Sequence, residues 1–245
     1  MARAFISAST TSAGTVNNVT VGSSVSVAFW FLATAASDFT GDVTAVSLTN
    51  HSTSPCYIIF DFGGAANTLT VFQSTPAGGG SVSGTITNDL NVWHHYAMSS
   101  AVGGTLYAYR DGVQIGSTGG VTVGNNFPLW LDVGLDGRFG RWIDGFIADV
   151  AVWGVQLSAS EILALAKGAR PNVIRPLSLS VYSPLDGLAS PEPDLSGNAN
   201  NLGLTHSPGP AFGPPLMQFT PRWPQFFPLP AIAAVSPGGF TWVEW

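Results

Sequence analysis

The sequence predicts an all-β fold: a sandwich of two antiparallel sheets with one short helix and an extended, proline-rich C-terminal arm. Short apolar runs, many of them alternating with polar residues, recur through the first 170 residues and are separated by Gly, Ser, Thr and Asn. This pattern is typical of antiparallel sandwiches. Fourteen of the 17 prolines lie in the last 75 residues. Proline cannot donate a ladder hydrogen bond, so this part cannot form a central sheet.

These features divide the chain into three parts. Residues 1–170 are predicted to form the sandwich. Residues 171–206 are predicted to be a linker that carries one further motif, described below. Residues 207–245 are predicted to be an arm rich in proline and aromatic residues.

The apolar runs place the strands along the first part of the chain. The glycine-rich run 77–80 is predicted to be a flexible turn, and Asp111-Gly112 a hairpin turn with positive φ at the glycine. The expected strands cover residues 15–21, 25–32, 42–48, 56–62, 68–73, 81–86, 93–99, 105–110, 112–115 and 129–133.

Residues 142–153 are predicted to form a central strand. Strict alternation puts Ile147 and Asp149 on one side and Phe146 and Val150 on the other. Large apolar groups fall on both sides, so we expect both faces of this strand to be covered. A glycine and several β-branched residues in the run disfavour a helix of the same length.

A short helix is predicted directly after this strand. Ser158 and Glu161 have the spacing of a capping box, in which the serine hydroxyl and the glutamate carboxylate each accept a backbone N–H. Apolar residues follow at helical spacing from Ile162 onward. Gly168 allows a left-handed end, and Pro171 prevents the helix from resuming.

Three motifs follow one another along the predicted sandwich. They are the strand Val25–Trp30, the hairpin Asn91–Ala97 with Leu106–Gly112, and the strand and helix Asp144–Ile162. Together they resemble the laminin-G-like domains of the concanavalin-A-like lectin/glucanase superfamily, which implies a jelly-roll sandwich. At one of the family's usual paired acids this chain has alanine, at position 148.

The linker carries a fourth motif. Tyr182-Ser-Pro-Leu-Asp-Gly187, followed by Asp194-Leu-Ser-Gly-Asn198, resembles the opening of another laminin-G-like domain, but too little chain follows to build one. Two alternatives stay open: an appendage, or a strand that completes a sheet in this chain or in a neighbouring copy.

Composition and charge argue against one class of partner and leave the nature of the surface open. The net charge is −6, with 8 basic residues and no basic run, which argues against nucleic acid. Charged residues make up only 9% of the chain, against about 25% in typical soluble domains. A surface that contacts other proteins and a neutral surface rich in Ser, Thr and Asn explain this equally well.

Targeting signals and disulfides are not expected. The first 14 residues lack the apolar core of a secretory signal, and no run of 18 apolar residues is present. Cys56 is the only cysteine, and its apolar neighbours favour a buried, unreactive thiol. We therefore expect a protein assembled inside a cell, without a membrane partner.

Catalysis is not expected either. Glucanases of this fold need two carboxylates that flank the scissile bond. The chain has three glutamates: Glu161 is assigned to the helix cap, and Glu192 and Glu244 lie in the proline-rich part. The adjacent His94 and His95 would point to opposite faces of a strand, so they cannot share a metal ion.

Calcium is the one cofactor that the resemblance implies, because many laminin-G-like domains bind it at a sandwich rim. The candidate ligands are Asp136, Asp144, Asn125 and Asn126. Calcium takes six to eight oxygens, and these residues are scattered, so a role in turns is favoured. A sugar could be contacted by Trp130 or Trp142, although a core position is favoured for both.

The C-terminal arm is predicted to bind a partner. A disordered segment is usually polar, whereas this arm is aromatic and carries only two charged side chains, Arg222 and Glu244. Proline keeps such a segment extended and lowers the entropy lost on docking. Packing on its own sandwich is the alternative. The partner-binding residues are Phe212, Phe219, Trp223, Phe226, Phe227, Phe240, Trp242 and Trp245.

Taken together, the sequence predicts a non-enzymatic structural protein of a bacteriophage particle, assembled in the host cytoplasm. Laminin-G-like proteins with this kind of extension resemble those encoded among phage structural genes. The expected role is capsid decoration or a head or tail fibre module, with contacts to other virion proteins and to further copies of the chain. The alternative is a carbohydrate-binding adhesion module for host glycans.

Overall fold

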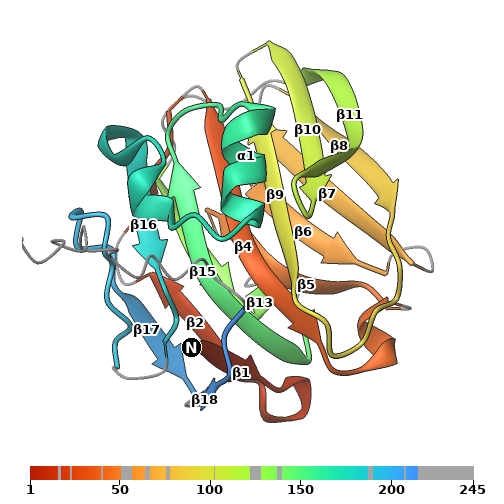
Figure 1. The fold of residues 1–245 in the computed structure, drawn as a ribbon, viewed down its shortest axis with the longest axis vertical. Coiled ribbons are helices and arrows are strands. Elements are labelled where there is room, and N and C mark those ends of the chain that lie inside the picture. Colours follow the sequence, from red (N-terminus) through yellow and green to blue (C-terminus); the bar gives the residue numbers. More distant parts are fainter. Residues whose placement is uncertain are drawn as a thin grey trace, which may run out of the picture.

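Two antiparallel sheets pack face to face, with one α-helix on the outer face of the first sheet (Figure 1). The structure is a computed structural model. It describes residues 1–15, 18–22, 24–39, 41–50, 57–63, 67–75, 78–101, 103–121, 128–136, 140–186, 190–206 and 208–214. The predicted all-β sandwich with one short α-helix is confirmed for this part of the chain.

The first sheet, called sheet A, lies beneath the helix. Its strand order is β11-β10-β9-β4-β15-β1-β18, and β16 pairs with β15 beside β1. The strands are β1 (Ala2–Phe5), β4 (Val25–Ala33), β9 (His94–Ser100), β10 (Gly104–Arg110), β11 (Val113–Val121), β15 (Gly145–Trp153), β16 (Leu179–Ser183) and β18 (Gly209–Ala211).

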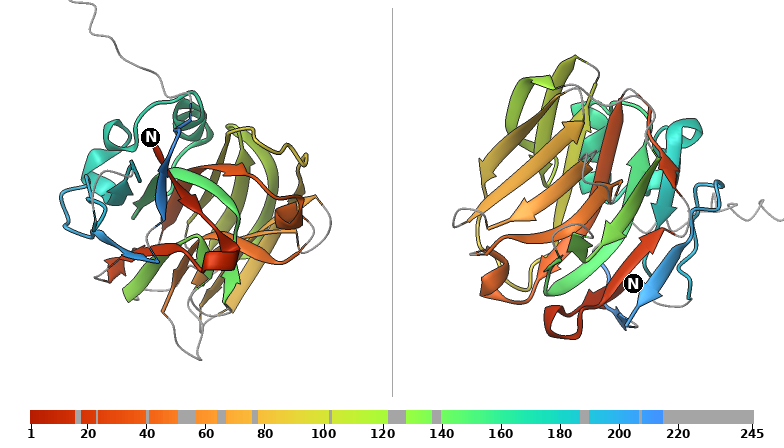
Figure 2. Two further views of the ribbon diagram at one scale, coloured as in Figure 1. Left: turned by 90° about the horizontal axis from the view of Figure 1, so that it is seen from below. Right: turned by 180° about the vertical axis from the view of Figure 1, so that it is seen from behind.

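The second sheet, called sheet B, forms the other layer, as the view from behind shows (Figure 2). Its order is β17-β2-β12-β5-β6-β7-β8, and β3 pairs with β12. The strands are β2 (Ser12–Thr15), β3 (Val19–Thr20), β5 (Val43–Thr49), β6 (Tyr57–Phe62), β7 (Thr68–Thr75), β8 (Gly78–Thr85), β12 (Pro128–Val133) and β17 (Leu202–Thr205). A small hairpin of β13 (Leu135–Asp136) and β14 (Arg141–Trp142) stands beside it.

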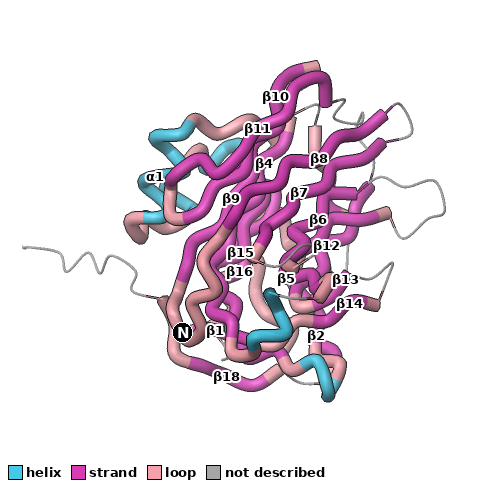
Figure 3. Tube along the Cα trace, turned by 90° about the vertical axis from the view of Figure 1, so that its right-hand side faces the viewer, coloured by secondary structure: helices cyan, strands magenta, loops and turns pink. Residues whose placement is uncertain are grey.

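Helical structure is short and confined to connections (Figure 3). Four 3-10 turns are described: η1 (Ser7–Ser9), η2 (Ala36–Phe39), η3 (Pro171–Val173) and η4 (Pro176–Ser178). The α-helix α1 covers Ala159–Ala166 and begins with the predicted capping box of Ser158 and Glu161. No helix in the described ranges is long and apolar enough to cross a membrane.

An aromatic cluster fills the space between the sheets. The ring of Phe29 on β4 meets Phe60 on β6 edge-on at 4.9 Å, and Tyr96 on β9 meets Phe62 in the same way at 5.0 Å. These rings come from both sheets and are at most 1% exposed. Such edge-to-face pairs add about 0.5–1.5 kcal/mol each beyond their buried area, so this cluster fixes how the two layers pack.

The predicted central strand is confirmed as β15, but its alternation is not strict. β15 lies between β4 and β1, and its pairing with β4 shifts between Ala148 and Ala151. The cause is Asp149, which has a φ of 49° and accepts a hydrogen bond of 2.6 Å from the Tyr182 hydroxyl. This bulge puts Ile147 and Val150 on the same inner face, where strict alternation had separated them.

The prediction of a flexible turn at residues 77–80 is wrong, because Gly78, Gly79 and Gly80 begin β8. Gly79 pairs with Ser74, and a Cβ atom at Gly79 would lie 2.6 Å from the backbone oxygen of Gln73. Glycine is therefore required here by the close approach of two strands rather than by a turn.

Residues after 170 also add strands to both sheets. β16 pairs with β15, β17 with β2, and β18 with β1. The fourth sequence motif thus supplies a strand that completes a sheet within this chain. The division of the chain at residue 170 stays a prediction about domain organisation.

The second half of that motif covers the free edge of β16. The Asp194 carboxylate accepts the backbone N–H of Tyr182 at 2.9 Å, and Leu195 donates to the Tyr182 carbonyl. The side-chain amides of Asn198 and Asn200 donate to the Ser180 carbonyl at 3.2 and 3.0 Å. These bonds satisfy an edge that could otherwise pair with another chain.

A buried ion pair joins the N-terminal strand to the segment that follows β16. Arg3 on β1 donates to the Glu192 carboxylate at 2.5 Å and also to the carbonyl of Pro208. Arg3 is 6% exposed and Glu192 is fully buried. Because each charge compensates the other in the interior, the segment after β16 is held against the N-terminal strand.

The two adjacent histidines point to opposite faces of β9, as the sequence predicts. His94 bonds to Asp111 at 2.7 Å, whereas His95 is 2% exposed and its ring lies 5.4 Å from that of Trp30. Burial lowers the pKa of His95 to about 4, because the interior disfavours the charged imidazolium.

This burial makes stability depend on pH. Between pH 6.5 and about 4 the unfolded chain binds a proton at His95 that the folded chain does not, so stability falls as the pH falls through this window. We expect a loss of up to about 3 kcal/mol from this group. Urea unfolding at pH 7 and pH 4 should show a smaller difference in His95→Leu than in the parent.

His206→Gln is the matched control, because His206 is exposed. An unchanged pH difference in His95→Leu would contradict this assignment.

Candidate functional site

An open groove lies on the outer face of sheet A, beside the start of α1. It has a volume of about 430 Å³, within the range of small-molecule sites. Its lining residues are Tyr107, Tyr109, Gln114, Gln156, Leu157, Ser158, Ala159 and Arg175. We call it the tyrosine groove.

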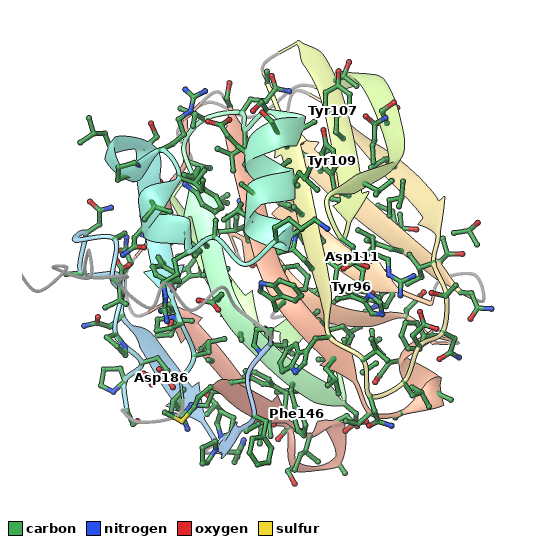
Figure 4. The ribbon with its side chains drawn as sticks, viewed as in Figure 1. Tyr96, Tyr107, Tyr109, Asp111, Phe146 and Asp186 are labelled. Carbon is green, nitrogen blue, oxygen red and sulfur yellow. The ribbon has the colours of Figure 1, made fainter. Side chains whose placement is uncertain are left out.

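Two tyrosines form one wall of the groove. Tyr107 and Tyr109 alternate on β10 and share its outer face beside α1 (Figure 4). Their ring centroids are 6.4 Å apart and the rings are tilted by 40°. Tyr109 is buried against the helix, whereas Tyr107 is partly exposed. Burial and the neighbouring Tyr107 raise the pKa of the Tyr109 phenol, so the Tyr109 ring stays neutral at physiological pH.

A row of residues that includes two serines crosses sheet A beneath the opposite wall of the groove. Tyr107 is opposite Ser99, Ser99 is opposite Ser26, and Ser26 is opposite Trp153. Because serine is small, the chain leaving β15 can cross above this row. We call residues 155–158 the crossing segment.

Hydrogen bonds to the two serines hold the crossing segment. The Ser26 hydroxyl donates to the Val155 carbonyl at 2.9 Å and accepts the Leu157 N–H at 2.9 Å. The Ser99 hydroxyl donates to the Leu157 carbonyl at 2.8 Å. Both serines are fully buried, so these bonds are shielded from water and fix the segment beside Tyr107.

Arg175 closes the rim of the groove in a strained conformation. Its φ of 47° and ψ of 52° are left-handed, although it is not glycine and precedes Pro176. Such strain costs on the order of 1–3 kcal/mol and marks functional sites more often than others. The Arg175 guanidinium donates to the Glu161 carboxylate at 2.5 Å.

Glu161 links this rim to the helix cap. Its carboxylate accepts the Arg175 guanidinium and also the N–H and hydroxyl of Ser158, each at 2.8 Å. The Arg175 hydrogen bond is the main cause that lowers the pKa of Glu161 to about 2. The pair therefore stays ionised and adds no net charge to the groove.

The groove can hold a neutral ligand that has both an apolar face and hydroxyl groups. Tyr107 offers an aromatic face beside its own hydroxyl. Gln114 and Gln156 each carry an amide that can donate and accept, and neither amide bonds to another described residue. A few polar groups beside an aromatic surface are the usual make-up of a binding site.

The predicted calcium ligands are not brought together by the described residues. Asp136 is buried on β13, opposite Arg141. Asp144 accepts the N–H and hydroxyl of Ser7 at 2.8 and 2.5 Å. Asn125 and Asn126 lie outside the described residues. Within the described ranges, no three His, Cys, Asp or Glu side chains are placed to hold a metal ion, so calcium stays a prediction.

The other predicted site residues lie away from the groove. Trp130 on β12 and Trp142 on β14 are half-buried, and neither lines it. Phe212, the first aromatic of the arm, is 91% exposed just after β18. The remaining arm residues lie outside the described part of the chain: Phe219, Trp223, Phe226, Phe227, Phe240, Trp242 and Trp245.

Sequence reasoning missed the tyrosine groove. The alternation of Tyr107 and Tyr109 does place them on one face of a strand, and this was the available signal. Gln114 is paired with Tyr109 through the β10–β11 hairpin, so the predicted turn at Asp111-Gly112 was a second signal. Gln156 and Arg175 carry no such signal, because the crossing segment and the segment before η4 are placed by tertiary packing.

The fold defines a class of two-layer, lectin-like sandwiches. Residues 7–163 match the family model of the concanavalin A-like lectin/glucanases superfamily. This range is more than half of the 245 residues, so the chain belongs to that superfamily. A search of curated proteins finds no match.

Solved structures from several organisms share the fold. A candidate carbohydrate-binding protein from Bacteroides ovatus superposes with a TM-score of 0.59 at 19% identity, over 83% of this chain and 58% of that one. A native heptameric SAP-like pentraxin from Limulus polyphemus gives 0.50 at 16% identity, over 66% and 77%. Domain 4 of the arabinanase AbnA from Geobacillus stearothermophilus, in complex with arabinotriose, also gives 0.50 at 16%, over 61% and 69%.

The serine row can be tested by one substitution. Ser26→Ala leaves the Leu157 N–H and the Val155 carbonyl without their buried partner. Such a loss costs about 1–3 kcal/mol, so the free energy of unfolding in urea should fall by that amount. Ser81→Ala, at an exposed position on β8, is the control. Equal stability of the two variants would contradict the role of the row.

Proposed function

We propose that this protein is a non-catalytic carbohydrate-binding module and that the tyrosine groove is its glycan site. The observation that carries the proposal is the pair Tyr107 and Tyr109 beside the amides of Gln114 and Gln156, which bond to no other described residue. A sugar ring has an apolar C–H face that stacks on an aromatic ring, and hydroxyls that bond to amides.

The comparisons support this reading. The Bacteroides ovatus protein is described as a candidate carbohydrate-binding protein, and the AbnA domain was crystallised with arabinotriose. The two described glutamates are also engaged elsewhere, Glu161 with Arg175 and Glu192 with Arg3. Neither is placed as a free acid or base beside the groove.

Glycan binding should depend on Tyr107. We expect Tyr107→Ala to weaken binding of any glycan found on an array by at least about tenfold, which corresponds to about 1.4 kcal/mol. Isothermal titration calorimetry checks the affinity, and thermal unfolding checks that the variant folds.

Trp142→Ala is the matched control, because Trp142 is a partly exposed aromatic outside the groove. Loss of binding in Trp142→Ala with full binding in Tyr107→Ala would place the glycan site elsewhere.

We infer a second role for the C-terminal segment, as the anchor of a virion structural protein. The proposal is a capsid decoration or a head or tail fibre module of a bacteriophage, assembled in the host cytoplasm and attached to virion proteins and to further copies of itself. It is supported by the aromatic arm and by the 91% exposure of Phe212 where the arm begins. Glycan binding by the sandwich is compatible with it.

Deleting residues 215–245 tests the anchor, because it removes the arm but keeps β18 paired with β1. We expect the shortened chain to fold and to be lost from purified phage particles. A full-length variant with its arm aromatics from Phe219 onward changed to Ser is the control and should also be lost. Full occupancy of the particles by the shortened chain would refute the anchor.

A further inference from the structure

The tyrosine groove is the first of three adjoining hollows. A second hollow, of about 560 Å³, is lined by Gly154 and Val155 and by residues 176–180, together with Ser196 and Asn198. Its lining adjoins that of the tyrosine groove in two chain segments. Gly154 and Val155 directly precede residues 156–159 of the groove, and residues 176–180 directly follow Arg175.

The third hollow continues the second. It has a volume of about 280 Å³ and is lined by Asn18, Thr20, Ser180, Asn198 and Asn200. Ser180 and Asn198 belong to both the second and the third hollow. We call the three hollows together the trough.

The pairing of sheet A gives the direction and length of the trough. Tyr107 on β10 and Leu179 on β16 lie in one row, which runs through Ser99, Ser26 and Trp153. The trough therefore crosses the strands rather than following them. From β10 to β16 it spans four strand spacings, or about 19 Å.

The far end of the trough presents oxygen acceptors. The amide nitrogens of Asn198 and Asn200 both donate to the carbonyl of Ser180 on β16. Each amide nitrogen is thereby used, and the oxygen that remains on each amide is a group that can accept a hydrogen bond from a ligand hydroxyl. Asn18 and Thr20 are exposed and add further polar groups.

The middle of the trough is open and has a mixed lining, in which Ser178, Ser196 and Asn198 stand beside apolar side chains. Leu177 is fully exposed there, next to Pro176 and Val155. Among the described residues that line the three hollows, Arg175 is the only charged side chain, and it is already paired with Glu161. A lining of polar and apolar groups side by side, without net charge, suits a neutral polymer of sugars, whose rings carry both hydroxyls and apolar C–H faces.

Other polymers fit less well. A nucleic acid requires several cations along its backbone, and the trough offers none beyond the paired Arg175. An extended peptide would add to the edge of β16, but Asp194, Leu195, Asn198 and Asn200 already occupy that edge.

We propose that the trough binds a linear, neutral polysaccharide along several consecutive sugar residues, rather than a single terminal sugar. This inference rests on the proposed glycan site. In it, Tyr107 stacks on one sugar residue and the asparagine-lined end binds another, several residues away along the same chain.

The test uses ladders of neutral oligosaccharides, from disaccharide to octasaccharide, of arabinan and of β-linked and α-linked glucans. We expect affinity measured by calorimetry to rise with chain length, by at least about tenfold in the dissociation constant. The double variant Asn18→Ala with Thr20→Ala should lose that gain and still bind the short members like the parent. Neither side chain makes a bond that holds the fold among the described residues.

Asn88→Ala is the matched control, since Asn88 is exposed and lines none of the three hollows. If affinity depends on Tyr107 but not on chain length, or if the double variant keeps the full gain, the extended trough is refuted and the proposed glycan site stands. If none of these glycans binds the parent, the extended trough is refuted, and the proposed glycan site is refuted as well if the glycan array also shows no binding.

Discussion

The structure depends on one constraint: β15 has to be covered on both faces and both edges. Its inner face packs on the aromatic core, and its outer face is covered by α1 and the segments around it. β4 takes one edge, while β1 and β16 share the other. Asp149 marks the point where the two partners meet, because the bulge there turns its carboxylate to the Tyr182 hydroxyl on β16. A strand so enclosed leaves little freedom for the segments that cover it.

The covering segments create the site. The chain leaves β15 and must reach β10's side of the outer face before α1 can begin, and the buried hydroxyls of Ser26 and Ser99 fix its path. β16, which pairs with part of the other edge of β15, is a short strand, and its own free edge is occupied by the residues that follow it. The tyrosine groove and the hollows beyond it lie along these two segments. A binding surface built in this way rests on rigid strands, which favours a preformed site.

Membership of the superfamily does not by itself determine function, because sandwiches of this kind host several functions. Membership follows from the match over residues 7–163, whereas the Limulus, Bacteroides and Geobacillus structures share only 16–19% identity with this chain. The groove adds the specific chemistry: two tyrosine rings, two amides that bond to no other described residue, and one arginine held by a capping glutamate. Together these suit a hydroxyl-rich, uncharged ligand.

Local sequence determined much of the architecture. Most of the strands between residues 25 and 153, the hairpin at Asp111-Gly112 and the capping box at Ser158 follow from periodicity, turn chemistry and capping, which act over a few residues. The N-terminal strand β1 was not predicted, because its four residues acquire their role only through pairing with β15 and β18. The glycine run in β8 looked like a turn for the same reason: the close approach that requires glycine comes from β7.

The candidate site also has one part that the local sequence determines and one part that only the tertiary structure determines. Alternation along β10 sets Tyr107 and Tyr109 on one face, and this is visible in the sequence. Their meeting with Gln156 and Arg175 is decided by the tertiary structure, since it needs the crossing segment, the serine row and the covered edge of β16 at once. Sequence specifies what each segment prefers over a few residues, whereas the site arises from packing between segments that are far apart along the chain.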